Sequence, residues 1–211
     1  MFDDKRSPKD LPMLKTHSVL EKTLAQKTRG IRKGATLKAE GDRSQHRFCV
    51  KKGWLAASKS LQDGGRQILE FILPGETYDP TGADGRTSFV QIEALCDAVV
   101  VAIDTTTWAR LLQENPDLWN YERLMANALQ ARRSEHMLRL GKASAETRIA
   151  YVLLELFLRV TDGEAGRKRA FHVPLGQQQL GDFAGLSSVH VCRTLRRLSR
   201  QGVVTTGDHM D

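Results

Sequence analysis

The chain has 211 residues and a formal net charge of +7, from 32 Lys and Arg against 25 Asp and Glu. This length allows two modest domains with their own cores, and the positive charge favours a polyanionic partner. No apolar run approaches the roughly 18 residues that indicate a membrane-spanning helix, and residues 1–10 lack the apolar core of a secretory signal. We therefore expect a cytoplasmic protein with no membrane segment.

The sequence offers little for metal binding or catalysis. Its three cysteines, Cys49, Cys96 and Cys192, are widely spaced and form no Cys-x-x-Cys pair, so neither a disulfide framework nor a zinc site is indicated. Cys49 and Cys96 lie in apolar, strand-like runs and are expected to be buried. Nucleophile elbows, phosphate loops and paired carboxylates are also missing from the sequence. We expect no bound cofactor and no enzyme activity.

The N-terminal half changes from helical to strand-like character. Residues 11–24 fit one or two short helices. Residues 30–104 consist of short apolar or alternating runs separated by Gly, Asp and Pro at regular spacing, which favours an antiparallel barrel or sandwich. Asp63-Gly64-Gly65, between two such runs, indicates a hairpin.

A long helix is predicted next. Asn115-Pro116 is a suitable helix start, and residues 117–140 contain neither Gly nor Pro. A helix of this length between two domains favours pairing with a second copy of the chain, whereas the alternative is packing along its own N-terminal domain. Gly141 is expected to end this helix, and another with core spacing is expected to begin at Ser144.

The stretch Gly176–Val204 carries the clearest pattern in the chain. It predicts a helix over residues 177–184, a turn over 185–187 and a second helix over 188–200. Gly185 suits the left-handed conformation that ends a helix, and Ser187 is a good N-cap. Two helices joined by such a turn form a helix-turn-helix, and the following run 203–206 indicates the strand of a wing.

The second helix separates an apolar stripe from a basic face. At about 100° per residue, Val191, Leu195 and Leu198 fall on the buried side, and no acidic residue occurs between Leu186 and Arg200. This asymmetry fits a recognition helix in a DNA major groove, although a solvated basic face is the alternative. The residues expected to contact DNA are Gln177, Gln178, Ser187, Ser188, Val189, His190, Arg193, Arg196, Arg197 and Arg200.

A β-rich region, a long helix and a winged helix, in this order, resemble the Crp/Fnr family of bacterial regulators. The resemblance runs from about Leu11 to the end of the chain and is most specific at Gly30–Asp42, Gly53-Trp54, Asp63–Gly75 and Gly176–Val204. It implies an α+β protein with a jelly-roll, cyclic-nucleotide-binding-like sensor domain (double-stranded β-helix, 1–116), a dimerisation helix (117–141) and a winged helix-turn-helix DNA-binding domain (142–211). It also implies a homodimer that reads a palindromic operator on double-stranded DNA and contacts RNA polymerase.

Only some of the family's typical DNA-contacting residues are present at the corresponding positions of this chain. Arg193 matches the arginine that family members use on a guanine, whereas Val189 stands where the family often has Glu and Ser188 where cyclic-AMP receptor proteins have Arg. The operator is therefore expected to differ. Gln177 and Gln178 match positions that often contact phosphate.

The ligand-binding pattern of the family is incomplete. Members that bind cyclic AMP use a Gly-Glu pair and an Arg-Ser or Arg-Thr pair, for which Gly75-Glu76 and Arg86-Thr87 are candidates. However, Gly75 aligns better as the turn glycine before this segment, and Ser88, rather than Arg86, falls at the position of the phosphate-binding arginine. A buried cyclic phosphate needs a charged partner, so we do not favour a cyclic-nucleotide-responsive regulator, nor haem ligated by His17, His46 or Cys49. The remaining alternative is a sensor or adaptor whose winged helix contacts another protein.

Overall fold

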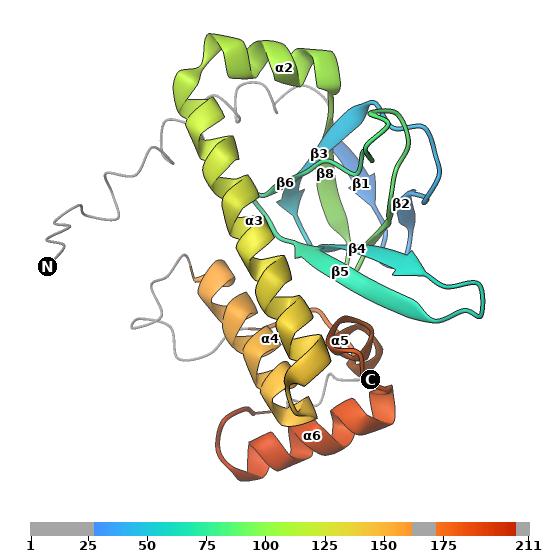
Figure 1. Cartoon of the computed structure of the whole chain (residues 1–211), viewed down its shortest axis with the longest axis vertical. Coiled ribbons are helices and arrows are strands. Elements are labelled where there is room, and N and C mark those ends of the chain that lie inside the picture. Colours follow the sequence, from blue (N-terminus) through green and yellow to red (C-terminus); the bar gives the residue numbers. More distant parts are fainter. Residues whose placement is uncertain (1–27, 162–171, 206–211) are drawn as a thin grey trace, which may run out of the picture.

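The computed structural model describes residues 28–161 and 172–205. The short helices expected within residues 11–24 lie outside these ranges. A two-layer β-structure forms the N-terminal part, and a long helix runs from its far end down to a compact group of C-terminal helices (Figure 1). Within the described ranges, no helix is long and apolar enough to cross a membrane.

The β-structure consists of two four-stranded antiparallel sheets, which confirms the predicted jelly-roll sandwich. The strands of the first sheet, in spatial order, are β1 (Thr28–Ile31), β8 (Ala98–Asp104), β3 (His46–Lys52) and β6 (Thr77–Tyr78). Those of the second sheet are β2 (Thr36–Lys38), β7 (Gln91–Ala94), β4 (Leu55–Ser60) and β5 (Arg66–Ile72).

The predicted hairpin at Asp63-Gly64-Gly65 joins β4 to β5. Ser60 pairs with Arg66 at its base, and Gly64 adopts a φ of 88°, which favours glycine. The Asp63 carboxylate accepts a hydrogen bond from the Gly65 backbone N–H at 2.9 Å. The turn is therefore built by its own residues, which is why it could be predicted locally.

The sandwich core is formed by apolar side chains that point inward from both sheets, including Phe48, Val50, Leu55, Ile72, Ile92 and Val100. Cys49 points to the opposite side of β3, where it packs with Trp108 and Leu118. It is buried as expected, and burial raises the pKa of its thiol to about 11. Cys96 is only partly buried because it lies after β7 has ended, so the expectation of a buried strand residue was wrong for this position.

Three helices connect the sandwich to the C-terminal region. They are α2 (Thr105–Glu114), α3 (Pro116–Lys142) and α4 (Ala145–Val160). The long helix is confirmed, but Gly141 does not end it: the helix continues to Lys142, and the N–H of Ala143 still donates to Arg139 O. A single Gly costs a helix only about 1 kcal/mol relative to Ala, so it is not sufficient to stop one. Ser144 caps α4 as expected by accepting from the Thr147 N–H.

A second core joins the outer side of the β4–β5 sheet to the C-terminal helices. Trp54, Phe71 and Leu73 contribute from the sandwich. The helical side is formed by Ile149, Val152 and Leu156 of α4, Leu180 and Phe183 of α5 (Gln177–Ala184), and Val191, Leu195 and Leu198 of α6 (Ser188–Arg200). Helix α5 therefore packs directly on β5 of the N-terminal domain, and α6 packs on α4 and α5.

Candidate functional site

Helices α5 and α6 have the bounds predicted from the sequence. Gly185 lies in the left-handed region, with φ 65° and ψ 43°. The hydroxyl of Ser187 accepts a hydrogen bond from the His190 N–H at 3.3 Å and so caps α6. Together these two residues set the turn of a helix-turn-helix.

The turn also depends on Gly181, whose role the sequence pattern did not indicate. The N–H of Leu186 donates to Gly181 O at 3.0 Å. A Cβ built on Gly181 would lie 2.4 Å from the Leu186 carbonyl oxygen. The chain after α5 therefore returns across Gly181 at a distance that only glycine permits.

The buried side of α6 is as predicted and includes one further residue. Val191, Leu195 and Leu198 are buried, and so is Thr194. The Thr194 hydroxyl donates to His190 O at 2.9 Å, so its burial leaves no unpaired donor. Thr194 lies one turn before Leu198, so helical spacing could have identified it.

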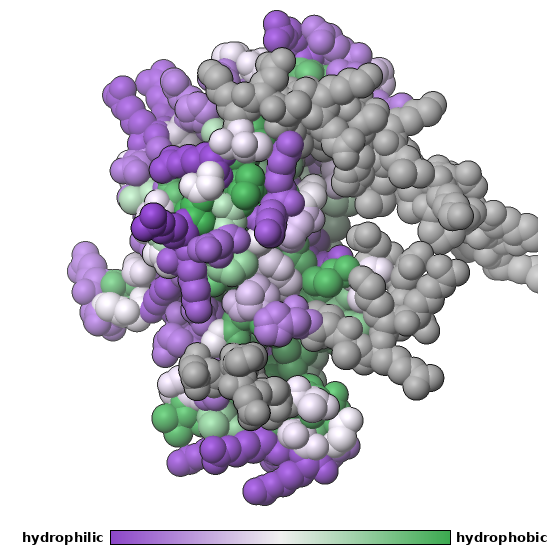
Figure 2. Space-filling view, turned by 180° about the vertical axis from the view of Figure 1, so that it is seen from behind, coloured by the Kyte–Doolittle hydropathy of each residue, from purple (hydrophilic) through white to green (hydrophobic). Residues whose placement is uncertain are grey.

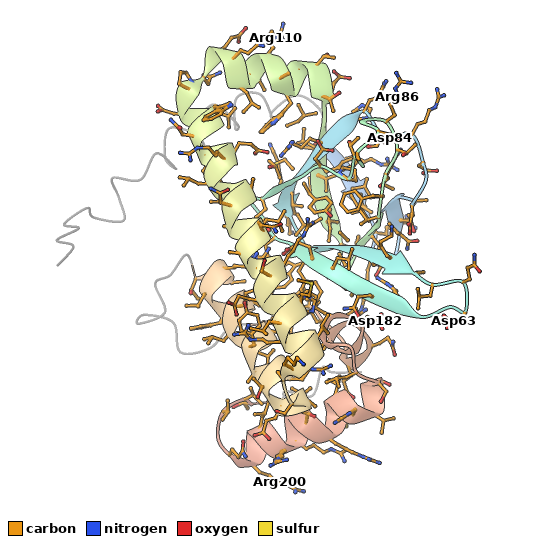
Figure 3. All side chains as sticks on the ribbon, in the orientation of Figure 1. Asp63, Asp84, Arg86, Arg110, Asp182 and Arg200 are labelled. Atoms are coloured by element: carbon orange, nitrogen blue, oxygen red, sulfur yellow. The ribbon has the colours of Figure 1, made fainter. Side chains whose placement is uncertain are left out.

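The other side of α6 forms a basic surface at the end of the molecule opposite α2 (Figure 1). Figure 2 shows hydrophilic side chains along the lower edge, which α6 forms in Figure 1. Arg200 is at this edge, whereas Arg110 is at the far end on α2 (Figure 3). The exposed residues of this surface are Val189, His190, Arg193, Arg196, Arg197 and Arg200.

The remaining predicted contact residues differ in how exposed they are and in whether they already have a partner. Ser187 is exposed and Ser188 is partly exposed. Gln177 and Gln178 begin α5, and the Gln178 amide donates to Asp182 at 2.6 Å. Arg197 is ion-paired with Glu146 of α4 at 3.1 Å, although most of its side chain remains exposed.

The C-terminal end of α5 is held by two other elements, β5 and α3. The carbonyl of Phe183 accepts a hydrogen bond from the Gln67 amide of β5 at 2.7 Å and lies 2.8 Å from His136 Nε2 of α3. The Phe183 ring stacks on His136 and on Phe71, with centroids 3.9 and 4.8 Å apart. Burial lowers the pKa of His136, which favours the neutral ring required by this apolar contact.

A buried charge cluster fixes α4 to the sandwich. The Arg159 guanidinium donates to Glu70 at 2.9 Å, to Glu76 at 2.7 Å, to Glu155 at 3.0 Å and to the Phe71 carbonyl at 2.6 Å. Arg132 of α3 lies 3.7 Å from the Glu70 carboxylate. Burial raises the pKa of Glu70 to about 7, although the charges of Arg159 and Arg132 act in the opposite direction.

A cavity of about 230 Å³ lies between the sandwich and α3. Charged and phenolic side chains dominate one part of its lining: Arg47, Glu70, Glu76, Tyr78, Arg132 and Arg133. Glu70 and Glu76 therefore face this cavity and also hold Arg159.

The residues expected for a cyclic nucleotide are not assembled at this cavity. Arg86 is exposed on a loop away from α3 (Figure 3), and its N–H donates to Asp84. Ser88 is buried, with its hydroxyl donating to Val90 O at 2.6 Å. Glu76 is occupied by Arg159 and by the Leu73 N–H. These residues do not fit a cyclic phosphate.

The residues considered for haem are also dispersed. His46 is exposed at the start of β3, Cys49 is buried on the other side of the sheet, and His17 lies outside the described ranges. In the part of the chain that the structure describes, no group of three His, Cys, Asp or Glu side chains could hold a metal ion.

Comparison with known protein families finds a match for the N-terminal β-structure and another for the C-terminal helices. Residues 28–115 match the cyclic nucleotide-binding domain, and residues 147–210 match the Crp-like helix-turn-helix domain. The chain belongs to the Crp/Fnr family. Members of this family are transcription factors, so the chain is a DNA-binding transcription regulator and not an enzyme.

Several Crp/Fnr relatives align over most of the chain. The nitrogen fixation regulation protein FixK of Bradyrhizobium diazoefficiens is 29% identical over 81% of this chain and 71% of its own length. The transcriptional activator FnrA of Stutzerimonas stutzeri is 28% identical over 86% and 74%. The solved structure of FixK2 from Bradyrhizobium japonicum has the same fold, with a TM-score of 0.74 at 24% identity over 87% of this chain and 89% of that one.

Two short strands expected around the helix-turn-helix do not form in the described residues. Residues 203–205 are irregular, and the rest of the expected wing lies outside the described ranges. The run Phe171-His172-Val173 also has the apolar pattern that favours a short strand, but residues 172–173 are likewise irregular. A strand needs a paired neighbour, which a local apolar pattern does not supply.

Gly181→Ala is expected to lower the free energy of unfolding by about 1–3 kcal/mol, because its methyl group would meet the Leu186 carbonyl. The matched control is Gly141→Ala in α3, which has open space around it and should raise stability by about 0.5–1 kcal/mol. Chemical denaturation followed by circular dichroism measures both changes. Equal effects of the two substitutions would contradict the close approach.

The raised pKa of Glu70 predicts a defined pH dependence. Because its folded pKa of about 7 exceeds its ordinary value of 4.5, its contribution to stability is complete below about pH 4.5 and is lost as the pH rises through about 7. Glu70→Gln should therefore flatten the fall in unfolding free energy between these values. The surface substitution Glu135→Gln should leave the wild-type slope in place, and an unchanged slope in Glu70→Gln would refute the assignment.

Proposed function

We propose that the protein binds double-stranded DNA as a homodimer and reads a palindromic operator with α6, one copy in each half-site. The observation that carries the proposal is the two-sided character of α6, which buries Val191, Leu195 and Leu198 and exposes Arg193, Arg196 and Arg200. A capped, rigid helix with such a face suits the major groove. Two copies would occupy successive grooves about 34 Å apart.

The exposed residues of α6 divide into two roles in this proposal. Arg193 lies nearer the start of the helix, the part that contacts base edges, and its guanidinium can donate two hydrogen bonds to one guanine. Arg196 and Arg200 lie toward its end and bind phosphates, which fix orientation but do not read sequence. Gln177, Gln178, Ser187, Ser188 and His190 complete the interface, and Arg197 reaches it from its ion pair with Glu146.

The dimer seam is proposed along the exposed side of α3. Leu124, Ala131 and Leu138 recur every seven residues and are exposed in the single chain, with Leu124 at 44% and Leu138 at 57%. Asn127 and Ser134 fall at the alternating positions, which gives the 3-4 spacing of a two-stranded coiled coil. A polar residue within such a seam lowers affinity but specifies register.

The same proposal divides the chain into a sensor domain (residues 1–116), a dimerisation helix (117–141) and a DNA-binding domain (142–211). Several relatives are named transcriptional activators, which supports contact with RNA polymerase in the cytoplasm.

Selection from random DNA with the purified chain, without added ligand, tests the proposal as a whole. We expect an enriched palindrome whose half-sites are separated by about one helical turn. Binding that is sensitive to salt but enriches no sequence would contradict it.

The roles of the arginines can be separated on the selected operator. Arg193→Ala should cost about 1–3 kcal/mol for each half-site and relax selection at one base pair, whereas Arg196→Ala and Arg200→Ala should weaken binding to specific and scrambled DNA alike. Mobility shifts on both DNAs measure this, with Arg110→Ala on the exposed far end of the molecule as the control. Equal losses on both DNAs for Arg193→Ala would reject its role in base reading.

A further inference from the structure

One exposed residue of α6 does not fit a purely electrostatic interface. Val189 is 59% exposed and is the single large apolar side chain left exposed on this helix. The buried side is already filled by Val191, Leu195 and Leu198. Neither core packing nor attraction to phosphate therefore accounts for a valine at this position.

The position of Val189 places it where bases are read. It is the second residue of α6, and the first turn of a recognition helix approaches the base edges most closely. Arg193 is four residues later, on the same side of the helix and about 6 Å further along its axis. Since base pairs are stacked about 3.4 Å apart, the two side chains address positions one or two base steps apart.

A valine side chain can neither donate nor accept a hydrogen bond. In the major groove, the feature that favours an apolar contact is the C5-methyl group of thymine, because thymine alone among the four bases carries a methyl group on that edge. The β-branched side chain is also stiff, so little rotamer freedom is lost on contact.

We propose that Val189 reads the methyl group of a thymine in each half-site, one or two base pairs from the guanine bound by Arg193, and so determines specificity at that position. This inference rests on the proposed function, because it requires α6 to lie in the major groove.

The test exchanges thymine for deoxyuracil, which removes the methyl group but keeps base pairing. Each thymine of the selected half-site is replaced in turn, in both half-sites together, and affinity is measured by fluorescence anisotropy. For the wild type, we expect one position at which the exchange weakens binding about fourfold per half-site, or about 15-fold for the dimer, as for one buried methyl group. The effect should disappear in Val189→Ala and persist in part in Val189→Thr, which keeps one methyl group.

The outcomes distinguish this inference from the proposed function. A position at which deoxyuracil weakens the wild type but not Val189→Ala supports it. Equal weakening of both proteins means that another residue reads the methyl group, and no effect at any thymine means that the methyl is not read; either result overturns the inference while sequence-specific binding stands. Failure to select any sequence would remove the proposed function itself, and the inference with it.

Discussion

The contact on which the rest of this structure depends is the burial of Arg159 among three carboxylates and a backbone carbonyl. A guanidinium taken out of water is stable only when its donors are matched, and these acceptors come from β5, from Glu76 just before β6, and from α4 itself. Removing one partner of such a buried pair costs about 3–5 kcal/mol. The charges therefore determine where α4 lies against the sandwich, and α4 supplies much of the core on which α5 and α6 pack.

Helix α3 has an inner side that packs against the rest of the chain and an outer side that is exposed in the single chain. Its inner side contacts the sandwich through Leu118 and Arg132 and contacts α5 through His136. Its outer side carries the spaced leucines of the proposed seam. A helix that is packed on both sides has no single apolar stripe.

The parts of the fold that the sequence predicted are those fixed by local chemistry. Gly185 and Ser187 specify a turn and a cap within a few residues, so the bounds of α5 and α6 were predicted correctly. Two polar residues of the long helix, Arg132 and His136, could not be interpreted in this way. Their partners, Glu70 and Phe183, are distant in the chain and are brought close only by tertiary packing, which also explains why the cavity was missed.

Glu70 and Glu76 belong to two environments at once, since each borders the cavity and each binds Arg159. Thermodynamic linkage follows from this double role. A ligand in the cavity that alters the charge on either carboxylate also alters the free energy with which α4 is held. Because coupling is reciprocal, a change in how α4 is held, such as one caused by DNA binding, alters the affinity of the cavity for that ligand. Through these two carboxylates, the free energy of occupying the cavity between the sandwich and α3 is coupled to the free energy that positions the basic surface of α6.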